Sequence, residues 1–260
     1  MPIRALGPID RVFVTYVFLR QGLTYDALGA LFGVHWKVIS RIVKGVLPLL
    51  AKFFNHVFPV PTKQQLLETF PPSWKETLNG QFVAYIIDGC EFFTEVPGNP
   101  AQQALLYSYY KHHCTGKFLV ALTPDGYIAF VSKVYGGRIT DQELVHKCGF
   151  LEHLKDRGMN VMADKGFTSI SGDLIDMGAY LLAPSRKGDR AQFTTDETKV
   201  NATVSHLRIH VERAIKLLKN FGILQKTLPF EYWPHIDDIL SVIRGTVSLM
   251  GPTTDRNSAL

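Results

Sequence analysis

The chain has 260 residues, 46% hydrophobic and 20% charged, and this composition predicts a folded globular protein and excludes a disordered one. No apolar stretch approaches the length of a membrane span, and the short run at 12–19 is interrupted by Thr15, which argues against a secretory signal. Three widely spaced cysteines, with no C-x-x-C pair, favour a reducing compartment over a disulfide framework or a zinc knuckle.

The positive charge lies in one part of the chain. Residues 1–55 hold seven lysines and arginines but only two acids. Because the whole chain has 28 bases and 23 acids, the remainder has 21 of each and is neutral. A small basic module followed by a neutral domain predicts a nucleic-acid-binding module joined to a second domain.

The first predicted elements are two helices joined by a glycine turn. We expect Thr24 to cap the first helix and Gly33 to form the turn after it. The second helix is predicted at about 35–46. Gly29 provides the small residue needed where the two helices approach each other, which is typical of a helix-turn-helix. Three positions on the first helix have the spacing of an inward-facing apolar stripe: Leu28, Leu31 and Phe32.

The outward side of the second helix carries residues suited to phosphates and base edges in a major groove. The candidate DNA-binding residues are His35, Trp36, Lys37, Ser40, Arg41 and Lys44. A plain helical hairpin with a solvated basic face is the alternative, and helical spacing alone does not decide between the two.

The second domain is predicted to follow a proline-rich, polar linker at 59–80, and to extend over 81–250 with a tail at 251–260. "QFVAYIID" predicts a buried strand ending at Asp88, and the segment around Pro124-Asp125-Gly126 predicts a hairpin. A capping box of Thr140 and Glu143 predicts a helix, and strands and helices then alternate. This order predicts an α/β fold: a mixed sheet flanked by helices, after an all-α module at 1–58.

Two aspartates are expected to meet in this sheet. Asp164 ends the strand "NVMAD", and a right-handed crossover places that strand parallel to the Asp88 strand and beside it. Both carboxylates are therefore expected at the carboxyl ends of adjacent strands, where α/β sheets build their sites. Two carboxylates so close repel each other unless a cation lies between them, and hard divalent ions prefer oxygen ligands.

Glu212 is the candidate third ligand. The helix "LRIHVERAIKLLKNFG" has a buried stripe marked by Leu207, Val211, Ala214, Leu218 and Phe221. The adjacent stripe, Arg208, Glu212, Ile215 and Lys219, lies about 100° around the helix axis and can lean over the sheet. The alternative is that Glu212 only pairs with Arg208 and Lys216 at i±4.

Five motifs in this order, "IIDGCEFF", "SYYKHHCTGKFLVALTPDG", "VSKVYGGRITDQE", "VMADKGF" and "LRIHVERAIKLLKNF", resemble the DDE-superfamily endonuclease domain of Harbinger-type transposases. The N-terminal segment resembles the helix-turn-helix that precedes this domain in relatives, so the similarity runs from about Arg11 to Met250. The resemblance implies a ribonuclease-H-like fold, an Asp-Asp-Glu triad of Asp88, Asp164 and Glu212, and two Mg²⁺ or Mn²⁺ ions. Related bacterial transposases have a tyrosine where this chain has Ser205.

Asp141 competes with Asp164 as the second aspartate, but the strand before it is expected two places from the Asp88 strand. We therefore choose Asp164 and expect Asp141 to support the metal ligands or the fold. Candidate contacts to DNA phosphates near the triad are Lys165, Arg186, Lys187, Arg190, Arg208 and Lys219, although each could be a surface charge.

The resemblance implies a transposase that cuts double-stranded DNA at transposon ends and joins it to target DNA. It further implies a nuclear protein, at least dimeric on DNA, with a Myb-like DNA-binding protein as a candidate partner and no membrane association. A domesticated descendant that binds DNA and regulates without cleaving it is one alternative. A scaffold that depends on the Myb-like partner and a nuclease for structured RNA are two others.

Overall fold

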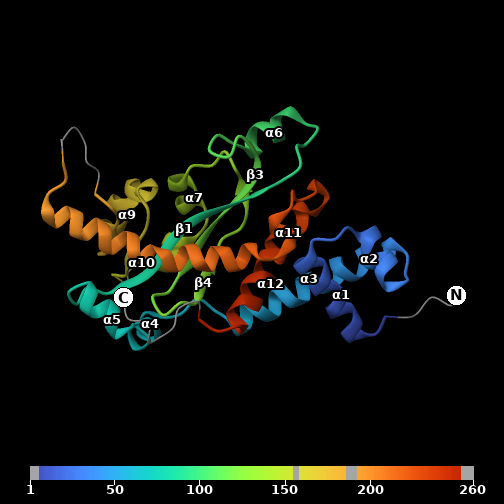
Figure 1. Cartoon of the computed structure of the whole chain (residues 1–260), viewed down its shortest axis with the longest axis horizontal. Coiled ribbons are helices and arrows are strands. Elements are labelled where there is room, and N and C mark those ends of the chain that lie inside the picture. Colours follow the sequence, from blue (N-terminus) through green and yellow to red (C-terminus); the bar gives the residue numbers. More distant parts are fainter. Residues whose placement is uncertain (1–5, 155–157, 186–191, 253–260) are drawn as a thin grey trace.

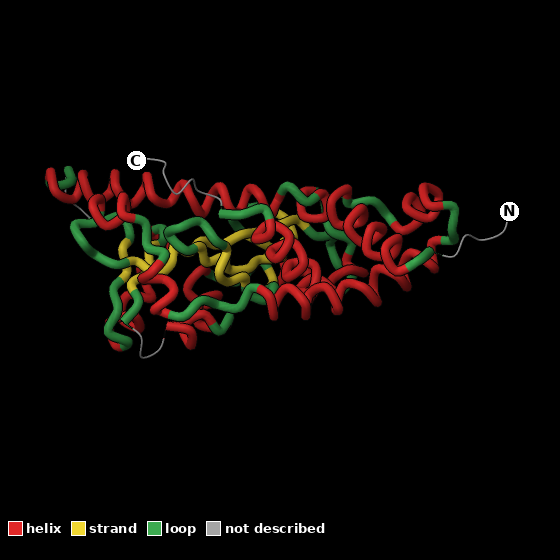
Figure 2. The backbone as a smooth tube through the Cα atoms, turned by 90° about the horizontal axis from the view of Figure 1, so that it is seen from below, coloured by secondary structure: helices red, strands yellow, loops and turns green. Residues whose placement is uncertain are grey.

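The computed structural model describes residues 6–154, 158–185 and 192–252. The molecule is elongated, with a helical region at one end and the sheet domain at the other (Figures 1 and 2). The helical region consists of α1 (Pro8–Gln21), α2 (Tyr25–Phe32) and α3 (Trp36–Val57). No helix of the described residues is long and apolar enough to cross a membrane.

The predicted helix-turn-helix is present as α2 and α3. The Thr24 hydroxyl accepts a hydrogen bond from the Ala27 amide, and Gly33 ends α2 with a left-handed φ of 68°. A Cβ added at Gly29 would lie 2.7 Å from the Val34 carbonyl oxygen, so the close approach of the two helices requires glycine there. The inward placement of Leu31 is wrong: its side chain is 63% exposed.

The correction at Leu31 has a simple geometric cause. The buried residues of α2 are Tyr25, Leu28 and Gly29, and Phe32 follows one turn later as a half-buried residue of the same stripe. These positions follow the i, i+3, i+4, i+7 pattern of one helix face, and Leu31 lies beside that face rather than on it.

Helix α3 is longer than the sequence predicts and continues through Pro48 to Val57. Its buried face continues as Leu47, Ala51 and Phe54, and these residues pack in the same core as the sheet domain. Tertiary packing therefore extends the helix beyond the segment that contains the helix-turn-helix.

The segment predicted as a linker contains two short helices, α4 (Lys63–Glu68) and α5 (Pro72–Thr77). A capping box of Thr62 and Gln65 begins α4, and Pro72 occupies the first turn of α5. Leu66 and Trp74 are buried, which fixes this connection onto the sheet domain.

The sheet has the order β2-β3-β1-β6-β7, with β4 and β5 also paired to β3. Its central strand β1 is antiparallel to β3 and parallel to β6, and β6 is parallel to β7. The strands are β1 (Val83–Phe93), β2 (Tyr107–Ser108), β3 (His113–Leu122), β4 (Ile128–Val131), β5 (Tyr135–Gly136), β6 (Asn160–Met162) and β7 (Leu181–Leu182). The predicted adjacency of the β1 and β6 strands is confirmed.

Helices cover both faces of the sheet (Figures 1 and 2). One core lies between the sheet and α10 (Thr195–Lys219), and the other lies between the sheet and α7 (Asp141–Lys147) with its neighbours. The remaining elements are α6 (Pro100–Leu106), α8 (Phe150–Leu154), η1 (Lys165–Ile170), α9 (Ser171–Asp176), α11 (Gly222–Gln225), η2 (Phe230–His235) and α12 (Ile236–Leu249). The predicted fold class, a mixed sheet with flanking helices after a helical module, is confirmed.

Helix α12 joins the helical region to the sheet domain. A Cβ at Gly245 would overlap the Phe54 ring at 2.1 Å, so α3 and α12 approach closely at this point. Arg244 is buried, and its guanidinium donates hydrogen bonds to the carbonyl oxygens of Ala129 and Phe58 and to Asn55 Oδ1. One side chain thus connects α3, α12 and β4.

Candidate active site

Asp88 lies in the middle of β1, which corrects the prediction that its strand ends there. The parallel pairing of β1 with β6 stops at Ile86 and Met162, but the antiparallel pairing with β3 continues to Phe93 and Thr115. Asp88 therefore stands two residues beyond the point where β6 leaves the sheet. Its carboxylate is 23% exposed, and its Oδ1 accepts a hydrogen bond from the Gly89 amide at 2.8 Å.

Asp164 follows β6 by two residues and caps η1. Its Oδ1 accepts a hydrogen bond from the Lys165 amide at 2.6 Å, and the side chain remains 49% exposed. Since β1 and β6 are parallel neighbours, Asp88 and Asp164 each lie two residues beyond the last shared pair, on the same side of it.

Arg208 of α10 lies between these two carboxylates. Its Nη2 is 3.9 Å from Asp88 Oδ2, and its Nη1 is 3.5 Å from Asp164 Oδ1. The predicted buried stripe of α10 is confirmed, because Leu207, Val211, Ala214, Leu218 and Phe221 are all buried. That packing directs the adjacent Arg208 stripe toward the aspartates.

Burial dominates the electrostatics of Asp88. Desolvation raises the pKa of Asp88 to about 6, although the Arg208 charge and the Gly89 amide favour the ionised form. The charges of Asp164 and Asp141 raise the pKa further by smaller amounts. A nearby cation therefore stabilises the ionised form of the Asp88 carboxylate.

Glu212 lies one turn after Arg208 on α10, and its side chain is exposed. Among the described residues, no ion pair joins Glu212 to Arg208 or Lys216, so the alternative i±4 pairing is not seen. Within the same part of the chain, no three His, Cys, Asp or Glu side chains stand close enough together to hold a metal ion. The structure therefore brings Asp88, Asp164 and Arg208 together, with Glu212 on the neighbouring turn.

Comparison with protein families gives two matches. The model described as "DDE superfamily endonuclease" matches residues 87–245. The model described as "Helix-turn-helix of DDE superfamily endonuclease" matches residues 4–55. The chain belongs to the DDE superfamily endonuclease family. No curated protein and no solved structure shows significant similarity to it.

Two residues of this DDE endonuclease, Asp88 and Asp164, offer donor groups that suit a divalent metal. The donors are carboxylate oxygens, which hard divalent ions prefer. Oxygens of Asp88 and Asp164 lie 3.9 and 3.5 Å from two different nitrogens of the Arg208 guanidinium, so both carboxylates face the same cationic group. The Asp88 carboxylate is largely removed from solvent, so a bound cation would offset a desolvation cost already present.

A second charged cluster of the endonuclease domain lies on the opposite face of β1, and the sequence analysis missed most of it. Lys117 of β3 is 2.8 Å from Asp141 Oδ1 and 3.8 Å from Glu91 Oε1, and it donates to the Ile139 carbonyl at 3.2 Å. Thr115 donates to Glu91 at 2.9 Å. The available signal was Glu91 and Lys117, each a charged residue within a largely apolar strand.

Asp141 also contacts both elements that carry the aspartates. A Cβ at Gly89 would lie 3.0 Å from Asp141 Oδ1, and one at Gly166 would lie 2.8 Å from Oδ2. The carboxylate of Asp141 thus occupies a notch formed by the glycines next to Asp88 and just after Asp164. The supporting role of Asp141 stays a prediction.

The remaining phosphate-contact candidates divide into two groups. Burial raises the pKa of the Cys90 thiol and the charge of Lys219 lowers it, which places Lys219 near β1. Lys165 lies 5.9 Å from the centre of the Phe193 ring. Three other candidates, Arg186, Lys187 and Arg190, lie outside the described residues.

The helix-turn-helix presents most of its DNA-binding candidates to solvent. His35, Trp36, Lys37, Arg41 and Lys44 are exposed. The Lys37 ammonium lies 5.6 Å from the centre of the Trp36 ring, and His35 Nδ1 accepts a hydrogen bond from the Lys37 amide. Ser40 differs from the other candidates: it is half-buried and its side chain lies beside the Tyr25 hydroxyl.

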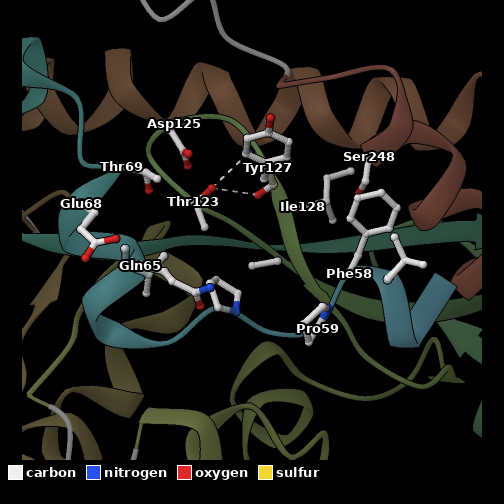
Figure 3. A pocket seen from close by; sticks show the side chains of 14 residues that line it. Phe58, Pro59, Gln65, Glu68, Thr69, Thr123, Asp125, Tyr127, Ile128 and Ser248 are labelled. Carbon is white, nitrogen blue, oxygen red and sulfur yellow. Dashed lines mark hydrogen bonds between the residues drawn. The ribbon is translucent and has the colours of Figure 1, made fainter.

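A cavity of about 330 Å³ lies apart from the carboxylates, where the end of α3, α4 and the β3–β4 turn meet. Thr123 and Tyr127 hydrogen-bond each other across the hairpin turn, and both line the cavity together with Glu68 and Asp125 (Figure 3). The residues lining it do not include Asp88, Asp164 or Glu212. The candidate active site of this DDE endonuclease lies elsewhere, where β1, the residues after β6 and α10 meet.

Proposed function

We propose that this chain is a Harbinger-type DNA transposase, which cuts DNA phosphodiester bonds at transposon ends and joins the ends to target DNA. Support comes from its membership of the DDE endonuclease family, its helix-turn-helix and its basic N-terminal region. The observation that carries the proposal is the approach of Asp88 and Asp164, from adjacent parallel strands, to one cationic group. All three predicted carboxylates are present, which favours an active enzyme over a domesticated DNA-binding protein.

Asp88, Asp164 and Glu212 would hold the two Mg²⁺ or Mn²⁺ ions. Ions bound in this way supply a water of lowered pKa and charge stabilisation for the leaving 3′ oxygen. Glu212 lies one turn after Arg208 on the same stripe of α10, which supports assigning it to the same site.

The basic residues of the chain would hold the DNA. Arg208 contacts both aspartates, Lys165 follows Asp164 in the chain, and Lys219 lies near Cys90 of β1. These bases would orient a phosphate whose negative charge grows in the transition state. The exposed helix-turn-helix residues would anchor the DNA at a second point in the major groove. Because the resulting 3′-OH is itself the nucleophile for strand transfer, the reaction needs no covalent enzyme intermediate.

The proposal includes the setting in which a transposase works. We expect the chain to act in the nucleus, to assemble at least as a dimer on DNA because two ends must be held together, and to work with a Myb-like DNA-binding partner. Binding of transposon ends by the isolated chain would argue against dependence on that partner.

The decisive experiment is a nicking assay on duplex DNA that carries the ends of the element encoding the chain, titrated with Mg²⁺ or Mn²⁺. The wild-type protein is expected to nick this DNA. Glu212→Gln is expected to reduce nicking to background while leaving DNA binding, measured by anisotropy, largely intact. The matched control is Glu152→Gln, which removes an exposed carboxylate from α8.

Equal nicking by wild type and Glu212→Gln would refute the assigned triad. DNA binding without nicking by the wild-type protein would instead point to the domesticated alternative. A parallel substrate of structured RNA distinguishes a DNA nuclease from an RNA nuclease.

A further inference from the structure

The guanidinium of Arg208 is unusually placed for a phosphate-binding group. It is directed at two carboxylates, with Nη1 3.5 Å from Asp164 Oδ1 and Nη2 3.9 Å from Asp88 Oδ2. The side chain is only 13% exposed, and its Nε is buried without a hydrogen-bond partner in the described part of the chain. Arg208 therefore neutralises the site while one of its own donors remains unsatisfied.

The contacts of Arg208 are long for a buried arginine. Charge-assisted hydrogen bonds between guanidinium and carboxylate groups are typically about 2.7–2.9 Å and often bidentate. Both distances at Arg208 are longer than that range. The two oxygens belong to different aspartates, so no single carboxylate forms a bidentate pair with the guanidinium. The guanidinium thus supplies charge without a fixed hydrogen-bond geometry, and other groups can replace it at low cost.

We infer that Arg208 is a displaceable counter-ion that competes with the divalent metal for Asp88 and Asp164. This inference rests on the proposed function, which assigns those aspartates to the metal. Before the metal binds, the guanidinium offsets the repulsion between the carboxylates. A bound divalent ion needs carboxylate oxygens at roughly 2.0–2.1 Å and supplies twice the charge, so it removes the attraction that holds Arg208 in place.

Displacement gives Arg208 its second partner. A guanidinium released at the edge of the site has a planar fork of donors that matches a phosphate. Metal binding would thereby create a DNA phosphate contact, and by thermodynamic linkage DNA binding would favour metal binding to the same degree. The site would remain closed to DNA phosphate until it is loaded with metal.

The test measures Mn²⁺ binding by calorimetry on the full chain without DNA. Arg208→Met is expected to bind Mn²⁺ about fivefold more tightly than wild type, because two loose ion pairs no longer compete. The matched control is Arg213→Met, which removes the same charge from an exposed position on the same helix and reports any effect of net charge. Its affinity is expected to stay within about twofold of wild type.

The outcomes separate the inference from the proposed function. Equal or weaker Mn²⁺ binding by Arg208→Met than by Arg213→Met overturns the inference. Mn²⁺ binding by wild type that Asp88→Asn leaves unchanged overturns the proposed function itself, whatever Arg208 does. Circular dichroism confirms that each variant is folded, and Arg208→Gln replaces Arg208→Met should the latter fail to fold.

A second measurement uses DNA affinity with Ca²⁺ as the probe ion. Wild type is expected to bind a generic duplex about fivefold more tightly in Ca²⁺ than in chelator, because metal binding and DNA binding are coupled through Arg208. Arg208→Gln is expected to lose most of this gain, while Arg213→Met keeps it. A gain that is the same in all three proteins contradicts the release of Arg208 toward phosphate.

Discussion

Two buried cations lie on opposite faces of the same central strand, and they are held in different ways. Lys117, on the α7 face, has a carboxylate at 2.8 Å and a carbonyl oxygen at 3.2 Å. Arg208, on the α10 face, has carboxylates at 3.5 and 3.9 Å and an unpartnered Nε. Both side chains are nearly buried, at 11% and 13% exposure, so burial alone does not explain the difference.

We interpret this difference as a division between a face with a structural cluster and the face that carries the candidate site. The Lys117 cluster joins β1, β3 and the start of α7, and it contacts the same strand, β1, that carries Asp88. The Arg208 cluster leaves its members incompletely satisfied, and buried groups left in this condition are expected at sites that bind a ligand. The rigid cluster therefore positions the incomplete one.

The largest expected effect comes from breaking the rigid cluster. Lys117→Met leaves the buried Glu91 and the partly buried Asp141 without their shared cation, and it should lower the free energy of unfolding by about 3 kcal/mol. Urea unfolding of the metal-free protein measures this change. Lys133→Met, at an exposed lysine after β4, is the matched control and should cost less than about 0.5 kcal/mol. A loss no larger than that of the control would falsify the structural role of Lys117.

The next effect has the opposite sign and depends on pH. Asp88→Asn should raise the free energy of unfolding in chelator by on the order of 2 kcal/mol at pH 8, because burial raises the folded pKa of Asp88 to about 6 from its ordinary 3.8. A carboxyl group with a raised folded pKa costs stability above that pKa and costs nothing below the unfolded value. The gain should therefore shrink as the pH falls through 6 and vanish near 4.

The control for this pH dependence is Asp176→Asn, which changes an exposed carboxylate at the end of α9. Its effect on the free energy of unfolding should stay within about 0.5 kcal/mol and be nearly flat over the same pH range. A pH-independent gain for Asp88→Asn would mean that packing, and not desolvation of the carboxylate, causes it.

Local signals in the sequence predicted much of this architecture correctly. The glycines at 29 and 33 fixed the helix-turn-helix, because backbone approach and a left-handed turn are properties of single residues. The capping box of Thr140 and Glu143 is present at the start of α7. The parallel adjacency of β1 and β6 followed from the handedness of the crossover, which does not depend on detailed side-chain packing.

Features that depend on pairing between distant segments were not predictable in the same way. The apolar run ends at Asp88, yet β1 continues to Phe93 because β3 pairs with it there. The contact between Lys117 and Glu91 requires the β1–β3 register, which places the two residues opposite each other. Similarly, α3 extends to Val57 because it packs on α12, an element almost 200 residues later in the chain.

The smallest expected effect, and the sharpest contrast with Lys117, is that of Arg208→Met on stability in the absence of metal. The variant should change the free energy of unfolding by less than about 1 kcal/mol, because the contacts it removes are loose and Asp164 is half-exposed. Removal of the buried, unpartnered Nε offsets part of the lost stability.

Double-mutant cycles in chelator give the direct comparison: the coupling energy between Lys117 and Asp141 should exceed the coupling energy between Arg208 and Asp164. Equal coupling in the two pairs would show that Arg208 is held as firmly as Lys117, and a firmly held guanidinium could not give way to a metal ion at low cost.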